Sequence, residues 1–223
     1  MAELIEAGVV DGRICHLIRG SGVDVEQFRP VEGQRADDEI RVFFASRLIA
    51  EKGINELLAA MERVRTSQPE AVLWIAGEPY AQNPTSLTAQ DLERLEALPW
   101  VRTFGHVDDV ERLLAQVDIV ALPSYREGTP KILLEAAACG LPIVATDIAG
   151  CRGVVEQGVN GNLVPVRAVK PLAKAIGRLC ADADARQRMG SKGRRIILEG
   201  FSSEIVVGRT LGVYGEVLRA DPG

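Results

Sequence analysis

Cysteine and histidine are scarce in this chain of 223 residues, and aromatic residues make up only 4% of it. The four cysteines (Cys15, Cys139, Cys151 and Cys180) form no CxxC pair, and no histidine cluster lies near them. This distribution argues against a disulfide framework and against a metal site. The two histidines fall in a predicted strand (His16) and a predicted turn (His106), and no acid and nucleophile can be assigned to complete a Ser-His-Asp triad.

Basic runs and long apolar runs are also missing. The net charge is −5 and the pI is about 5.2, so neither nucleic acid nor an anionic membrane surface is an expected partner. The longest apolar stretch, 132–145, is interrupted by Glu135, Gly140 and Pro142 and is too short to span a bilayer. Residues 1–10 lack the basic start and apolar core of a signal peptide, so we expect a cytoplasmic protein.

What the sequence does contain is a regular alternation of short β-branched runs with longer segments of helical period, which is typical of a parallel sheet covered by helices. Strands are predicted at 15–18, 41–45, 72–76, 101–104, 119–122, 143–146 and 162–164. Helices are predicted at 54–65, 88–97, 109–117, 130–139, 169–181, 185–199 and 204–218. The predicted fold class is therefore α/β, a Rossmann-like parallel sheet with helices on both faces. Such a sheet binds ligands at the carboxyl ends of its strands.

Two glutamates, Glu127 and Glu135, are separated by seven residues across the start of a predicted helix. Thr129 can cap this helix and Pro130 suits its first position, so both carboxylates would lie near its N-terminus. The positive end of the helix dipole disfavours Lys131 and the preceding arginine unless an anion lies between them. Carboxylates beside a phosphate site favour a sugar phosphate or a nucleotide sugar, although a solvated helix face explains the same spacing.

Two cations, Arg47 and Lys52, follow the predicted strand at 41–45, and Gly53 then opens a helix. An arginine fork and a lysine at the carboxyl end of a strand could both reach a diphosphate. A solvated basic pair, partnered by Glu51 or Glu56, is the alternative.

A glycine pair, Gly20 and Gly22, resembles part of the dinucleotide-binding turn. The third glycine of the GxGxxG pattern is missing, and no helical pattern follows. A tight turn accounts for these glycines better than a nicotinamide cofactor does.

Several motifs occur together and in order: RLIAEKG, FGHVDDVERLLAQVDIVALPS, EGTPKILLEAAACGLPIVAT and GVNGNLVP. Their combination resembles the C-terminal domain of the glycosyltransferase family 4 (group 1) enzymes, whose hallmark is E-x7-E. The resemblance covers nearly the whole chain and implies the C-terminal half of a GT-B fold. The finer pattern is similar to enzymes that extend O-antigen, capsule or exopolysaccharide chains from UDP-sugars.

The resemblance implies a role for each site residue. Arg47 and Lys52 would hold the donor diphosphate, and Glu135 would accept hydrogen bonds from the ribose. Glu127, with the backbone of Gly128, Thr129 and Lys131, would position the donor sugar. The base would lie against the backbone near His106 and Val107. Ser46 stands where many relatives have glycine, and Gly153 stands where the closer group has glutamate, which leaves the donor-sugar contacts open.

The resemblance further implies a retaining hexosyltransferase that needs no metal or other cofactor, because cations and a helix N-terminus can neutralise the diphosphate. Its partners would be the nucleotide sugar and a sugar or lipid-linked acceptor, and the complete enzyme could associate peripherally with the inner face of the plasma membrane. Family members place the acceptor site in an N-terminal domain. We therefore expect residues 1–40 to be a linker with a remnant of that domain, 41–200 the donor-binding domain, and 201–223 a C-terminal helix.

Two other functions remain open at this point. One is a non-catalytic nucleotide-binding module, which has the same fold without transfer activity. The other is an NAD-dependent dehydrogenase domain, which would need the complete GxGxxG turn and an acidic residue about twenty residues further on.

Overall fold

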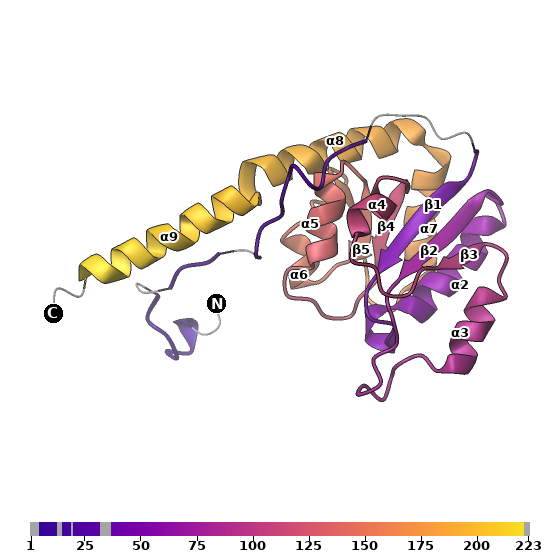
Figure 1. The fold of residues 1–223 in the computed structure, drawn as a ribbon, viewed down its shortest axis with the longest axis horizontal. Coiled ribbons are helices and arrows are strands. Elements are labelled where there is room, and N and C mark those ends of the chain that lie inside the picture. Colours follow the sequence, from indigo (N-terminus) through magenta and orange to yellow (C-terminus); the bar gives the residue numbers. More distant parts are fainter. Residues whose placement is uncertain (1–4, 13–14, 19, 32–36, 221–223) are drawn as a thin grey trace.

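A six-stranded parallel sheet forms the centre of the part of the chain that the computed structural model describes, residues 5–12, 15–18, 20–31 and 37–220 (Figure 1). The strands pair in the order β3-β2-β1-β4-β5-β6, and every pairing is parallel. The strands are β1 (Ile40–Ala45), β2 (Ala71–Ala76), β3 (Val101–Thr103), β4 (Ile119–Leu122), β5 (Ile143–Thr146) and β6 (Gly161–Val164). The predicted α/β class and Rossmann-like sheet are confirmed.

Helices cover both faces of this sheet (Figure 1). Helices α2 (Ile54–Arg65) and α7 (Val169–Ala181) pack against each other and against the sheet, whereas α5 (Lys131–Ala138) packs against β4, β5 and helix α8 (Ala183–Gly200). The remaining elements are η2 (Ala50–Lys52), α3 (Ala89–Glu96), α4 (Val110–Leu114), α6 (Ala149–Arg152) and α9 (Ser203–Ala220). From β1 the chain adds β2 and β3 on one side and then returns to add β4 on the other side of β1. The loops that follow the parallel strands β1 and β4 therefore meet at the carboxyl edge, where the strand order reverses.

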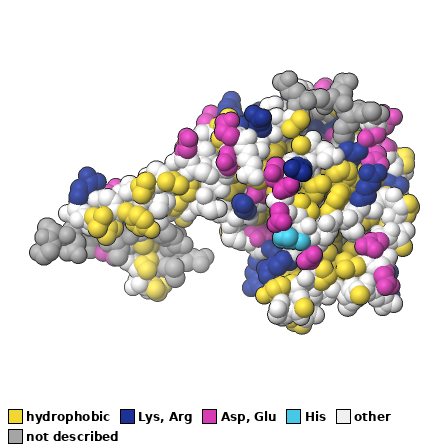
Figure 2. All heavy atoms as spheres, viewed as in Figure 1, with side chains coloured by type: hydrophobic (Ala, Val, Ile, Leu, Met, Phe, Trp, Pro, Cys, Tyr) yellow, Lys and Arg dark blue, Asp and Glu magenta, His cyan; other side chains and the backbone are white. Residues whose placement is uncertain are grey.

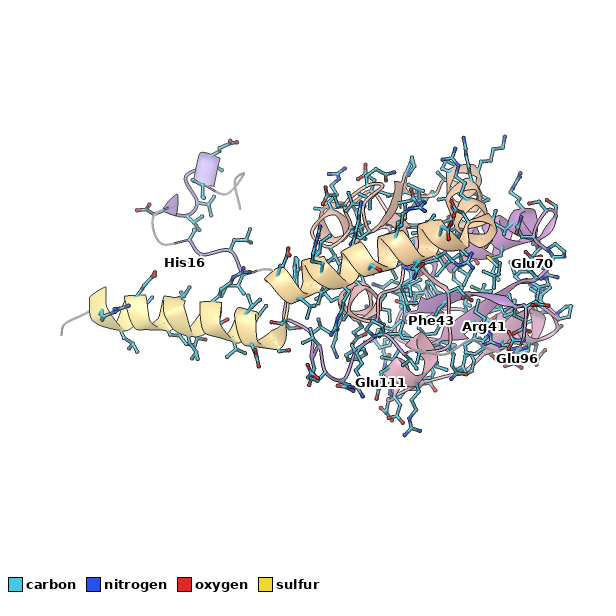
Figure 3. All side chains as sticks on the ribbon, turned by 90° about the horizontal axis from the view of Figure 1, so that it is seen from above. His16, Arg41, Phe43, Glu70, Glu96 and Glu111 are labelled. Atoms are coloured by element: carbon cyan, nitrogen blue, oxygen red, sulfur yellow. The ribbon has the colours of Figure 1, made fainter. Side chains whose placement is uncertain are left out.

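The core lies between the helices and the two faces of the sheet. All six residues of β2 are buried, as are all four of β4 and β5, which explains their near-continuous apolar sequences, since both faces of a parallel sheet are covered. Phe43 of β1 is fully buried, and Arg41 beside it places its guanidinium over the Trp74 ring, 4.8 Å from the centroid (Figure 3).

The predicted strand at 15–18 is wrong. These residues have no regular secondary structure and lie against α9. Leu17 also faces the loops that follow β4 and β5, but residues 15–18 pair with none of the strands that the structure describes. Figure 3 shows His16 there, and its Nε2 lies 3.7 Å from Glu216 Oε2. Residues 13, 14 and 19 are outside the described part of the chain. The expected helix at 109–117 is reduced to the five residues of α4, and the short elements η2 and α6 were not predicted.

Helix α9 projects beyond the sheet, and Figure 2 shows hydrophobic side chains along it. Val207, Leu211, Tyr214 and Leu218 are all more than half exposed. No helix among the described residues is long and apolar enough to cross a membrane. The proposed division into residues 1–40, 41–200 and 201–223 stays a prediction.

Gly53 joins η2 to α2 in a conformation that other residues rarely adopt. Its φ is 74°, and a Cβ added there would lie 2.2 Å from the carbonyl oxygen of Pro123. We expect Gly53→Ala to lower the free energy of unfolding by about 1–3 kcal/mol or more, since both the αL strain and the backbone clash must be relieved. Thermal or urea unfolding measures the change.

The matched control is Gly208→Ala in α9, where a Cβ would meet nothing within 4 Å. Removing a helical glycine there should stabilise the chain by about 0.5–1 kcal/mol. Equal effects of the two substitutions would contradict the close approach at Gly53.

Candidate nucleotide-sugar site

Helix α5 begins one residue later than the sequence indicated. Pro130 is its N-cap in an extended conformation (φ −69°, ψ 117°), no side chain caps the helix, and Lys131 is the first helical residue. Thr129 does not cap because it lies one position too early, and its methyl group faces Gly20. The predicted capping role of Thr129 and the placing of Pro130 at the first helical position are therefore wrong.

Glu135 lies within α5 and is only 4% exposed. Burial raises the pKa of its carboxyl group, and the ammonium of Lys131 opposes this rise. Lys131 Nζ is 3.1 Å from Glu135 Oε1, although the lysine side chain itself is 69% exposed. A buried acceptor with a single solvated partner is suited to bind hydroxyl donors from a ligand.

Glu127, in the loop between β4 and α5, forms an ion pair with Lys52, the last residue of η2. Lys52 Nζ lies 2.6 Å from Glu127 Oε1, and the side chains are 15% and 14% exposed. The alternative partners for Lys52, Glu51 and Glu56, instead bind Thr85 and Tyr125. Lys52 is thus neutralised within the chain. Lys131 is likewise paired with Glu135, so the expectation of a bound anion at the start of this helix is wrong for Lys131.

Arg47 has a separate partner. It is exposed at the end of β1, and its guanidinium carbon lies 5.0 Å from the centroid of the Tyr80 ring. A guanidinium stacked on an aromatic ring keeps its N–H groups available for a bidentate acceptor such as phosphate. Arg47 and Lys52 occupy neighbouring positions after the same strand, as the sequence predicted, but they have different contacts.

Two hollows open along the carboxyl edge of the sheet. The first, of about 340 Å³, is formed by the loops that follow β1, β2 and β3. Its lining includes Ser46, Arg47, Gly77, Glu78, Tyr80, His106 and Val107. A Cβ on Gly77, whose φ is 128°, would lie 1.9 Å from the carbonyl oxygen of Ser46, so only glycine lets these two loops meet. Within this hollow, His106 Nε2 lies 3.2 Å from Asp108 Oδ1.

The second hollow, of about 470 Å³, is formed by the loops that follow β4 and β5. Its lining includes Leu17, Glu127, Gly128, Thr129, Ala149, Gly150, Arg152 and Gly153. A Cβ on Gly150 would lie 2.0 Å from the carbonyl oxygen of Gly128, whereas one on Gly128 would meet nothing within 4 Å. The backbone at Gly128 is thus supported by α6 on one side and open on the other.

The structure therefore places the predicted site residues at one edge of the sheet but in two groups. Ser46, Arg47, His106 and Val107 line the first hollow, and Glu127, Gly128 and Thr129 line the second. Lys52 joins the second group through its ion pair with Glu127. Helix α5 follows this group in the chain: Pro130 is its N-cap, Lys131 is its first residue and Glu135 lies four residues further on.

Sequence reasoning missed several residues of this region. Glu78 and Tyr80 belong to the first hollow, and their position directly after a buried strand could have identified them. Tyr125 and its partners Glu56 and Arg167 were also missed. No local pattern joins these three residues, because they come from one helix and two loops that are far apart in the sequence.

Known proteins can be compared with this chain in sheet order, in the two hollows and in the two lysine–glutamate pairs. A family model described as "Glycosyl transferases group 1" matches residues 25–196. The chain belongs to the group 1 glycosyl transferases. The match covers every strand of the sheet and all the site residues predicted from the sequence, which confirms the resemblance.

Individual group 1 relatives and a solved structure are similar over most of the chain. A glycogen synthase of Mycobacterium tuberculosis is 31% identical over 87% of this chain and 47% of its own length. The capsular polysaccharide biosynthesis glycosyltransferase CapM of Staphylococcus aureus is 26% identical over 84% of this chain and 49% of its own. TarM of S. aureus, solved in complex with UDP, has a TM-score of 0.70 and 25% identity over 83% of this chain and 38% of its own. The chain spans about half the length of the curated relatives it matches.

Proposed function

We propose that this chain is the donor-binding half of a retaining glycosyltransferase that takes its sugar from a nucleotide sugar, with UDP as the favoured nucleotide. The acceptor would be a growing cell-surface polysaccharide or lipid-linked oligosaccharide, held with the help of a second domain. The UDP bound in TarM and the capsular role given in the name of CapM support these two choices.

The observation that carries the proposal is the Lys52–Glu127 ion pair beside the open backbone of Gly128. A diphosphate in this position would meet the ammonium of Lys52, and a sugar attached to it would meet the carboxylate of Glu127. The exposed guanidinium of Arg47 supplies a second cation after the same strand as Lys52. Charge that develops on a leaving diphosphate would be stabilised by these fixed groups, which is the reason for proposing transfer without a metal.

Each part of the nucleotide has a counterpart at the edge of the sheet. The first hollow, with the backbone at His106 and Val107, is suited to a planar base. Glu135 is suited to accept from the two ribose hydroxyls, because it is buried and has one cationic partner in the part of the chain that the structure describes. The Gly20–Gly22 turn, by contrast, leads into further turns without a helix, so a dinucleotide fingerprint lacks the element that would bind its pyrophosphate.

The test is calorimetry on this 223-residue chain with UDP, GDP, UDP-glucose and NAD, in buffer that contains EDTA. We expect weak binding of UDP and UDP-glucose and none of NAD, because one face of a cleft must offset the whole cost of immobilising the ligand. Binding that requires Mg²⁺, or NAD binding tighter than UDP binding, would contradict the proposal.

Activity provides the second measurement. This chain alone should transfer no sugar, whereas a polypeptide that adds an N-terminal acceptor domain should do so. Transfer by the chain alone would refute the two-domain interpretation. UDP binding without transfer by any extended form would instead favour a non-catalytic nucleotide-binding module.

A further inference from the structure

Tyr125 lies two residues before Glu127 and contacts a helix far from it in the sequence. Its phenol donates a hydrogen bond of 2.6 Å to Glu56 Oε1 in the first turn of α2. Burial raises the pKa of Tyr125 and the Glu56 carboxylate raises it further, so the phenol keeps the proton that it donates. The other oxygen of Glu56 is buried without a hydrogen-bond partner, which makes the phenol the one side-chain hydrogen-bond donor that we observe for this carboxylate among the described residues.

The backbone of Tyr125 reaches the turn that carries Lys52. Its N–H donates to the carbonyl oxygen of Glu51 at 2.8 Å, and Glu51 directly precedes Lys52 in η2. One residue therefore makes two bonds to the segment 51–56, one through its backbone and one through its side chain. The Lys52–Glu127 ion pair spans the same two segments.

A third loop covers the ring of Tyr125. The guanidinium carbon of Arg167, from the loop after β6, lies 4.5 Å from the ring centroid. Arg167 has a φ of 61° and is the only residue other than glycine with a positive φ in the described part of the chain. Such a backbone costs on the order of 1 kcal/mol or more, so the surrounding contacts must hold it. The phenol hydrogen bond and the stacked cation together fix the orientation of Tyr125.

We propose that Tyr125 is a positioning residue that sets the relative position of Lys52 and Glu127, and thereby determines how strongly the donor sugar adds to nucleotide binding. This rests on the proposed function, in which Lys52 meets the diphosphate and Glu127 the sugar. In this proposal Tyr125 itself contacts neither the diphosphate nor the sugar. Its hydrogen bond to Glu56 holds the loop 125–129 against the first turn of α2, which follows η2 after Gly53, so that a sugar attached to a phosphate on Lys52 lies within reach of Glu127.

The experiment measures the ratio of the Kd for UDP to the Kd for UDP-glucose on this chain, with UDP-N-acetylglucosamine as a second probe. Tyr125→Phe keeps the ring, the Arg167 stack and the backbone bond, and removes only the bond to Glu56. We expect the ratio to fall about three- to tenfold while the Kd for UDP changes little, as is typical when a coupled neighbour is altered. Glu56→Ala should give the same fall, whereas Glu56→Gln should preserve the ratio because its amide oxygen still accepts from the phenol.

A double-mutant cycle separates positioning from general destabilisation. In a Glu127→Gln background, Tyr125→Phe should cause no further change in the ratio, since its effect passes through Glu127. Tyr214→Phe, on a side chain that is 61% exposed in α9, is the matched control and should change nothing. If Tyr125→Phe leaves the ratio unchanged, or changes it equally with and without Glu127, the positioning role is wrong. If the unaltered chain binds neither UDP nor UDP-sugar, the proposed function itself fails.

Discussion

Glu135→Ala is expected to weaken UDP and UDP-sugar binding alike, by about ten- to a hundredfold. This corresponds to roughly 1.5–3 kcal/mol, the range for hydrogen bonds that involve a charged group. Glu135 is buried, and its one ion pair among the described residues is with the well-exposed Lys131, so its removal leaves no buried charge behind. The loss should therefore appear in ligand binding far more than in stability. Calorimetry with both ligands measures it.

Deoxynucleotides and Glu127 provide the controls for this prediction. If Glu135 binds the ribose, the unaltered chain should prefer UDP to 2′-deoxy-UDP or 3′-deoxy-UDP, and Glu135→Ala should lose that preference. Glu127→Ala should leave the affinity for UDP unchanged or slightly increase it, because Lys52 then loses the carboxylate that competes with phosphate. Glu127→Ala should lower the affinity only for UDP-sugars, in which the sugar is attached. Equal weakening of UDP by both substitutions would contradict this assignment of roles.

Lys52→Met is expected to weaken UDP binding by about ten- to a hundredfold while the affinity for uridine stays the same. The ammonium can reach only the phosphates in the proposed pose, so the loss should grow along the series uridine, UMP and UDP. The substitution also leaves Glu127, 14% exposed, without the partner that lies 2.6 Å away. We therefore expect a lower free energy of unfolding as well, because a largely buried carboxylate has lost its counterion.

A second substitution separates these two effects. The double variant Lys52→Met with Glu127→Gln removes both charges, so it should recover stability without recovering UDP affinity. Lys192→Met, on an exposed lysine of α8, is the matched control and should alter neither quantity. If the double variant regained UDP binding, Lys52 would act only as a counterion to Glu127 and not as a phosphate ligand.

The Lys52–Glu127 pair also bears on how a ligand would bind. The sequence predicted that Arg47 and Lys52 reach a diphosphate and that an anion lies between Lys131 and Arg126. In the structure each lysine already has a carboxylate partner, Lys52 with Glu127 and Lys131 with Glu135. Under the proposed function, a diphosphate would replace the carboxylate on Lys52, and the same exchange would release Glu127 for the sugar. Binding of phosphate and binding of sugar would thus be linked through one ion pair.

The sequence by itself determined the architecture and the edge at which the site lies. Six of the seven predicted strands are present. Buried parallel strands require near-continuous apolar runs, such as those of β2 and β4. These runs are local properties of the chain and can therefore be recognised in the sequence. The small residues and charges that follow the strands could be assigned to one edge for the same reason. Residues 15–18 show the limit of this argument, since an apolar run becomes a strand only where a neighbouring strand edge can accept its hydrogen bonds.

The tertiary structure alone decided which groups are partners. Lys52 has carboxylates directly before it and four residues after it in the chain, yet its partner is Glu127, 75 residues away. The contacts of Tyr125 with Glu56 and Arg167 likewise join the start of α2 and two loops that only the sheet order brings together. Helix and strand propensities act over a few neighbouring residues, whereas an ion pair depends on where the strands place the ends of their loops. Spacing along the chain therefore identified the charged residues of the site, and the packing of the sheet determined which of them meet.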